Sequence, residues 1–181
     1  MAGMGVSDSH LLPIVMAPAP VLKTKTRRVA DADAERVRAL IPRMLATMYH
    51  APGIGLAAPQ IGVGLAFTVI DLMPNDKAAP FAVINPEIIE KSAELATREE
   101  GCLSLPGQYA DVTRPARVKV RYRDVAGAVH EIAADGLLSA CLQHEIDHLN
   151  GILFIDHISS LKRNIILRRL AKERRQRSSA A

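Results

Sequence analysis

The chain has 181 residues, 49% of them hydrophobic and 23% charged, which is typical of one folded domain and predicts a single catalytic domain over residues 1–181. No apolar run reaches the roughly 18 residues that a membrane-spanning helix needs, and the first ten residues lack the basic and long apolar regions of a signal peptide. Two cysteines make no disulfide framework, so we expect a cytoplasmic protein without membrane attachment. The formal charge of +4 is concentrated at the end: residues 162–177 hold eight Lys or Arg against Glu173, a local +7, which leaves −3 for the rest.

The first predicted element is a helix that follows a flexible lead-in over residues 1–10. Its apolar residues recur with the period of a helix that packs one stripe against a core: Val37, Leu40, Ile41, Met44, Leu45 and Met48. Asp31 or Asp33 is expected to cap the start, and Pro52-Gly53 to end the helix. Pro42 lies inside the pattern, where it removes a hydrogen bond, so the sequence predicts a kink there or a late start.

Strands and two further helices follow. Residues 66–71 and the alternating segment 117–123 predict strands, and residues 82–85 and 128–132 are weaker candidates. A second helix is expected over 137–150, between Asp135-Gly136 and Asn150-Gly151. A basic C-terminal helix and tail are expected over 160–181, starting at Ser159 or Ser160, with four apolar residues available for packing: Leu161, Ile165, Ile166 and Leu170. Strands in the middle and helices late in the chain and at both ends predict an α+β fold.

The second helix carries the pattern H-E-x-x-H in residues 144–148. On a helix, residues i and i+4 stack on one face, so His144 and His148 can reach one metal ion while Glu145 flanks it. Two ordinary histidines on a helix are the plain alternative. The independent prediction of the helix favours the metal site.

A catalytic metal site usually has three protein ligands and one open position, so a third ligand is needed. Phe154 stands where a metzincin has its third histidine, which excludes that class. Glu173 lies among arginines in the tail, where we expect it to be exposed to solvent, so it is a poor candidate. Cys141 is separated from His148 by about 10 Å of helix rise, which is too far for its short side chain to reach the same ion. Cys102, in the Gly- and Pro-flanked segment 100–107, is the better candidate, although by itself it is more simply a buried thiol.

Three segments together, Gly53 to Gln60 (GIGLAAPQ), Glu100 to Ser104 (EGCLS) and Gln143 to His148 (QHEIDH), resemble the three signature motifs of peptide deformylases, in the same order. The likeness runs from about Leu12 to about Arg163. It implies an α+β fold with antiparallel or mixed sheets packed around a central metal-binding helix.

The resemblance also implies an activity: removal of the formyl group from the N-terminal formylmethionine of newly made polypeptides, with release of formate. It implies one divalent ion, Fe(II), held by Cys102, His144 and His148; the ligand types suit Zn(II) equally, and Ni(II) or Co(II) can occupy such a site in purified protein. By the same likeness, Gln60 and the backbone N–H of Leu103 stabilise the developing oxyanion, and Gly55 is a backbone contact to the substrate.

The chemistry of the residues supports this reading independently. A metal ion polarises the formyl oxygen and activates a water, and Glu145 can take the proton of that water and pass it to the leaving nitrogen. Ile54, Leu137 and Cys141 are candidates for the apolar walls of a methionine pocket, and ordinary core packing explains the last two equally well. Without the other motifs, Gln60 would be a surface side chain and Gly55 part of a plain turn.

The chain departs from the family pattern at three places: Pro42 within the first helix, about ten extra residues before Leu11, and Tyr109 where many members have Arg, which bears on contacts to the peptide backbone. The basic tail suggests docking on the ribosome of an otherwise monomeric enzyme, or else a solvated terminus. Two rival functions stay open, a metallopeptidase that cuts internal peptide bonds and a nucleic-acid-binding module with a structural metal.

Overall fold

The computed structural model describes residues 10–180, and nearly all of the predicted lead-in 1–10 lies outside them. Its strands are β1 (Gly55–Ala57), β2 (Phe67–Ile70), β3 (Phe81–Lys91), β4 (Leu95–Cys102), β5 (Leu105–Pro115), β6 (Val118–Arg123) and β7 (Val129–Ala134). Its α-helices are α1 (Ala34–His50), α2 (Gly136–Leu149) and α3 (Ser160–Ser179). Short 3-10 helices are η2 (Pro20–Lys23), η3 (Asp31–Asp33), η4 (Ala58–Ile61), η5 (Pro74–Asp76) and η6 (Phe154–His157).

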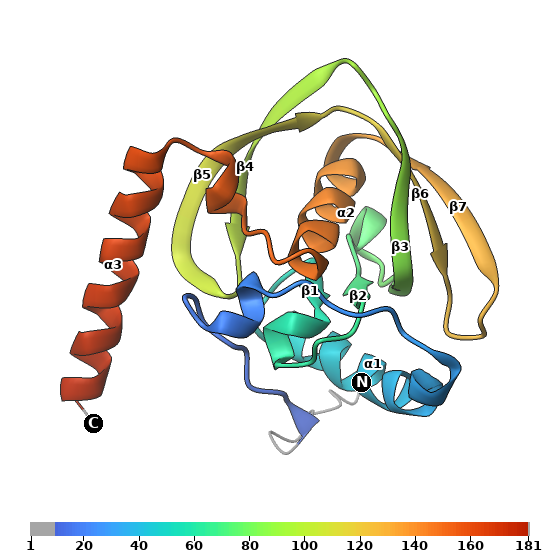
Figure 1. Cartoon of the computed structure of the whole chain (residues 1–181), viewed down its shortest axis with the longest axis horizontal. Helices are drawn as coiled ribbons and strands as arrows, with labels where there is room; N and C mark the ends of the chain where they lie inside the picture. Colours follow the sequence, from blue (N-terminus) through green and yellow to red (C-terminus); the bar gives the residue numbers. More distant parts are fainter. Residues whose placement is uncertain (1–9, 181) are drawn as a thin grey trace.

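The strands form two antiparallel sheets, one of five strands in the order β1-β2-β3-β6-β7 and one of the two strands β4 and β5. Figure 1 shows α2 in the centre, between β4 and β5 on one side and β3, β6 and β7 on the other. The predicted α+β fold, with antiparallel sheets around a central helix, is therefore confirmed. Among the described helices, none is both long and apolar enough to cross a membrane.

Helix α1 confirms the predicted apolar stripe, because Val37, Ile41, Met44 and Met48 are buried in a cluster with residues of β1 and β2. The late start is wrong: the helix begins eight residues before Pro42 and continues through it. Asp33 is at the N-cap, but its side chain makes no capping bond to the helix and instead accepts from the N–H of Ala30 at 2.8 Å.

The predicted strands all exist, and β3 is longer than expected. The sequence pattern stops at Asn85-Pro86, whereas β3 continues to Lys91 through a bulge between Ile84 and Glu87. Asn85 adopts a positive φ of 50°, and its side-chain amide pairs with both backbone groups of Val29. A proline at a bulge breaks the ladder locally without ending the strand.

The hairpin of β4 and β5 was not predicted. Its strands contain Gly, two prolines and several charged residues, and few of their side chains are buried. From Gln108 to Arg114, β5 does alternate between more buried and exposed side chains, but Gln108 and Arg114 on the buried face are polar. The sequence therefore shows no clear alternation of apolar and polar residues. The hairpin turns tightly at Leu103 and Ser104, because Cys102 pairs with Leu105.

Helix α2 packs its apolar face on the large sheet, and the cluster between them includes Val83, Val120, Leu142 and Ile146. It ends at Leu149, one residue before the predicted end, with Asn150 at the C-cap and Gly151 in the left-handed conformation with φ of 73°.

Helix α3 starts as predicted but stands apart beside β5 (Figure 1). Ile166 is buried and Leu170 partly buried against the cluster around β5 and η6. The expected packing of the other two apolar residues is wrong, since Leu161 is 70% exposed and Ile165 39%.

Candidate metal centre

The two histidines of α2 point to one place because they are one helical turn apart. Their ring centroids are 4.9 Å apart, and the His148 side chain is almost fully buried. Cys102 reaches the same place from the end of β4, and its Sγ lies 3.3 Å from Nε2 of His148. Within residues 10–180, these three are the group whose possible ligand atoms all lie within 4.8 Å of one another.

The two rival third ligands are elsewhere in the described chain. Cys141 is buried on α2 with its Sγ 3.9 Å from the carbonyl oxygen of Ile54, and Glu173 lies on α3, away from the centre (Figure 1). Neither belongs to the group formed by Cys102, His144 and His148 in residues 10–180.

The donor set fits a divalent metal ion. A thiolate with two imidazoles is a ligand set that Zn(II) and Fe(II) both accept. Burial and the neighbouring His144 lower the pKa of His148 well below its ordinary value, which keeps that ring in the neutral, ligating form. Among residues 10–180, its Nδ1 is buried without a hydrogen-bond partner, whereas its Nε2 faces Cys102 Sγ.

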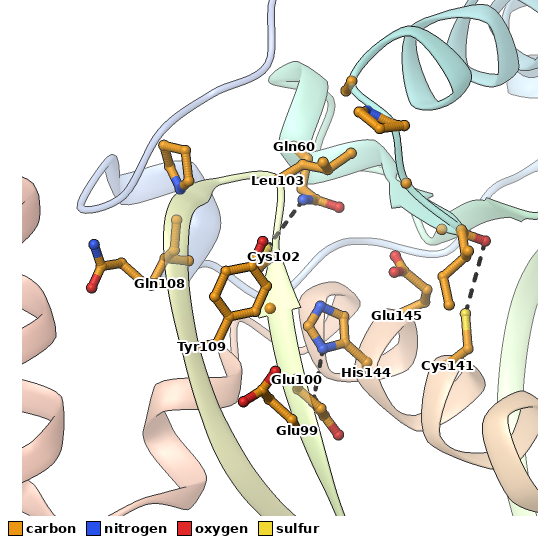
Figure 2. A pocket seen from close by; sticks show the side chains of 18 of the residues that line it. Gln60, Glu99, Glu100, Cys102, Leu103, Gln108, Tyr109, Cys141, His144 and Glu145 are labelled. Atoms are coloured by element: carbon orange, nitrogen blue, oxygen red, sulfur yellow. Dashed lines mark hydrogen bonds and ion pairs between the residues drawn. The ribbon is translucent and has the colours of Figure 1, made fainter.

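His144 is oriented by Glu100, whose Oε2 lies 3.0 Å from its Nδ1 (Figure 2). This contact leaves Nε2 for the metal centre and is the usual arrangement for a ligating histidine. Burial acts to lower the pKa of His144, but its contacts with Cys102 and Glu100 raise it to about 10 without a metal. A proton on this ring would compete with a metal ion for the ring nitrogen.

Behind Glu100 lies a buried network of charges that the sequence analysis missed. Arg114 of β5 donates to both carboxylate oxygens of Glu100, at 2.6 and 2.9 Å, and to Asp147 of α2 at 2.7 Å. Asp147 also lies 2.7 Å from Nε2 of His157. Burial acts to raise the pKa of Glu100, but the hydrogen bonds from Arg114 and His144 outweigh it and lower the pKa to about 2. This network ties the hairpin to the metal-bearing helix.

The carboxylate of Glu145 lies beside the three possible ligands and is 4% exposed. Its Oε2 accepts from the hydroxyl of Thr68 at 3.2 Å. Its Oε1 is so close to Gly55 that a Cβ on that glycine would meet it at 2.5 Å. Burial raises the pKa of Glu145 to about 7, against the opposing effects of His144 and Thr68, so it is suited to exchange a proton near neutral pH.

Gln60 lies on η4, directly after β1, and is buried. Its Oε1 accepts from the N–H of Ala57 at 2.9 Å, which fixes the amide so that Nε2 faces Cys102 Sγ at 3.4 Å and Ser104 Oγ at 3.2 Å. Leu103 follows Cys102 in the hairpin turn, and its side chain packs on Gly53. Both predicted oxyanion donors are thus next to the thiol.

A cavity of about 880 Å³ opens onto Cys102, His144 and Glu145. All four candidate substrate contacts line it: Ile54, Gly55, Leu137 and Cys141. Leu137 is 48% exposed, so it lies at the open side, whereas Cys141 is buried. Tyr109 also lines the cavity, 64% exposed, with its ring close against Gly101 (Figure 2).

Comparison with known proteins gives a consistent result. The family model of polypeptide deformylases matches residues 11–164. A peptide deformylase of Mesorhizobium japonicum is 52% identical over 161 residues, which covers 88% of this chain and 91% of the relative. The peptide deformylase of Methylocella silvestris is 53% identical over 166 residues, which covers 90% of this chain and 84% of the relative.

Solved structures agree. The crystal structure of a peptide deformylase from Legionella pneumophila has a TM-score of 0.86 at 43% identity and covers 93% of this chain and 98% of that one. The crystal structure of a peptide deformylase from Synechococcus elongatus in complex with actinonin has a TM-score of 0.81 at 44% identity. The match covers 87% of this chain and 86% of that one.

The fold and the centre therefore define a metal-dependent hydrolase. The chain belongs to the polypeptide deformylase family, and the family model extends over its sheets, α1, α2 and the start of α3.

Proposed function

We propose that this enzyme removes the formyl group from the N-terminal formylmethionine of newly made polypeptides and releases formate. The observation that carries the proposal is the placement of the Glu145 carboxylate beside Cys102, His144 and His148, at a cavity large enough for a peptide end. The family membership supports the same reaction.

The proposed roles follow from where each group lies. Cys102, His144 and His148 would hold one divalent ion, proposed to be Fe(II), which supplies Lewis acidity and a lowered water pKa when bound. Glu145 takes a proton from the attacking water as its oxygen bonds to the formyl carbon. It then gives that proton to the leaving nitrogen as the C–N bond breaks. Gln60 Nε2 and the N–H of Leu103 stabilise the negative charge that develops on the formyl oxygen.

The cavity suits a methionine side chain. Ile54, Leu137 and Cys141 supply apolar surface beside Glu145, and Gly55, at the start of β1, offers backbone groups to the peptide chain. An unbranched thioether fits irregular apolar space well. We expect shortened side chains at the peptide end to raise KM.

The test is formate release from an N-formylmethionyl peptide by protein purified without oxygen, with bound iron and zinc quantified and Glu145→Gln as the control. Release by the parent and its loss in the control supports the proposal. No release from folded, fully iron-loaded protein contradicts it. Digestion of an unformylated peptide would instead indicate a peptidase, and metal binding without any hydrolysis a binding module.

We further propose that the enzyme works as a cytoplasmic monomer and docks on the ribosome through α3. Eight Lys or Arg occupy residues 162–177, and Arg168, Arg169 and Lys172 are exposed. Clustered cations bind phosphate backbones in a salt-dependent way. Size-exclusion chromatography tests the oligomeric state: a monomer should elute at about its chain mass of 19.6 kDa, and elution at twice that mass would contradict this part of the proposal.

Docking is tested with the combined variant Arg168→Gln, Arg169→Gln and Lys172→Gln. Its affinity for ribosomes, measured by cosedimentation at low salt, should fall about tenfold. Gln in place of the exposed Arg36, Arg38 and Lys91, an equal charge change elsewhere, should leave it intact. Equal loss in both variants, or none in the first, contradicts docking through α3.

A further inference from the structure

Thr68 of β2 contacts the proposed base from within the protein. The side chain is fully buried, and its hydroxyl lies 3.2 Å from Glu145 Oε2 and 3.0 Å from the carbonyl oxygen of Leu56. Within residues 10–180, this hydroxyl makes the one hydrogen bond to the Glu145 carboxylate. The other oxygen, Oε1, lies beside Gly55, which lines the cavity.

The hydroxyl interrupts an otherwise apolar strand. All four residues of β2 are buried, and the other three are Phe67, Val69 and Ile70. A buried hydroxyl costs free energy unless it is hydrogen bonded, so an aliphatic side chain of the same shape would satisfy packing alone. The bond to Leu56 would satisfy the hydroxyl, but it does not explain why a polar group is there.

The contact with Glu145 gives that explanation. A threonine hydroxyl carries one hydrogen and two lone pairs, so it donates to one acceptor at a time and can also accept. An ionised carboxylate is the stronger acceptor, so the hydrogen points to Glu145 Oε2. Because this bond engages Oε2, it leaves Oε1 free on the side of Gly55 and the cavity.

We propose that Thr68 is a positioning residue for Glu145. Its hydroxyl holds Oε2 in place, so that Oε1 stays beside Gly55 and faces the reacting water. The proposal rests on the proposed role of Glu145 as the base. It adds a residue that touches neither metal nor substrate.

The test compares Thr68→Val, Thr68→Ala and Thr68→Ser in the metal-loaded enzyme with a formylated peptide. We expect kcat to fall about tenfold in the Val and Ala variants with KM within about twofold, because a displaced base affects the transition state and not substrate binding. The Ser variant retains the hydroxyl and should keep kcat within about threefold of the parent.

A matched control separates this effect from general loss of stability. Thr47 of α1 is 4% exposed, and its hydroxyl donates to the Arg43 carbonyl at 2.7 Å, away from the centre. Thr47→Val removes the same group from another buried site and should leave kcat unchanged. Metal content is measured for every variant and should equal that of the parent.

A crystal structure of the Thr68 variants supplies a readout besides activity. The Glu145 carboxylate should be rotated or disordered in the Val or Ala variant and in place in the Ser variant. Equal kcat in Thr68→Ala and the parent, or equal losses in the Ser and Ala variants, would overturn the proposal. A parent enzyme that releases no formate would instead overturn the proposed function and this inference with it.

Discussion

Gly55 leaves the space that the carboxylate of Glu145 occupies: a Cβ at residue 55 would lie 2.5 Å from Oε1 and 2.8 Å from Cδ. Real Cβ atoms do not approach so closely, and both partners are constrained, Gly55 by pairing with Ile70 and Glu145 by helix α2. The position of Glu145 in the third motif therefore requires a glycine at residue 55 in the first.

Gly55→Ala should displace Glu145 and lower kcat by about 100-fold, the scale expected when a reacting group moves by about 1 Å. Steady-state kinetics on a formylated peptide checks this. Gly64→Ala is the matched control and should retain the parental rate, because within the described part of the chain no heavy atom outside its two chain neighbours lies within 4 Å of its Cβ position. A Gly55→Ala enzyme with normal kcat would show that the carboxylate is free to move.

Removing the buried cation of the charge network should strongly destabilise the fold. The Arg114 side chain is 6% exposed, and Arg114→Met leaves the Glu100 carboxylate buried without its partner, which typically costs about 3 to 5 kcal/mol. Urea denaturation measures the loss. Arg117 forms an ion pair with Glu94, and the two side chains are 59% and 63% exposed. Breaking this pair in Arg117→Met should lower the free energy of unfolding by less than about 1 kcal/mol. Equal losses in the two variants would be the contrary result.

Stability of the metal-free protein should fall in acid because of Glu100. Its pKa is about 2 in the folded chain against an ordinary 4.5, so the unfolded chain binds more protons between these values. The stabilisation is complete above pH 4.5 and is lost as pH falls toward 2, up to about 3 kcal/mol in all. Urea midpoints between pH 6 and 3 test this, and Glu100→Gln should show a shallower decline. An identical decline in that variant would assign the acid sensitivity elsewhere.

The two cysteines should differ in metal binding. Cys102→Ala removes one of the three proposed ligands and should purify with much less than one metal per chain, while Cys141→Ala should bind metal at the parental level. Elemental analysis measures both. Chelation should lower the melting temperature of the parent, since a ligand at 100 times its Kd stabilises the folded state by about 2.7 kcal/mol. Metal loss in Cys141→Ala but not in Cys102→Ala would reverse the assignment.

Features that depend on local geometry were predictable from the sequence. The i, i+4 spacing of His144 and His148 fixes their common face wherever the helix packs, and the Gly151 stop is equally local. The stripe of α1 and the alternation in β6 report on a buried face in the same way. The third candidate ligand, Cys102, came from the need for a third donor and from the motif around it.

Contacts between distant segments were decided by the tertiary structure alone. Glu100 meets Arg114 only because the pairing of β4 with β5 brings them together. The buried face of β5 carries the polar residues Gln108 and Arg114, so no apolar alternation predicts the strand. Thr68 and Glu145 are 77 residues apart and meet because α2 packs on the sheet. A sequence specifies such contacts through the packing of the whole chain, so short patterns identify the groups that do the chemistry, and the fold determines which groups hold them in place.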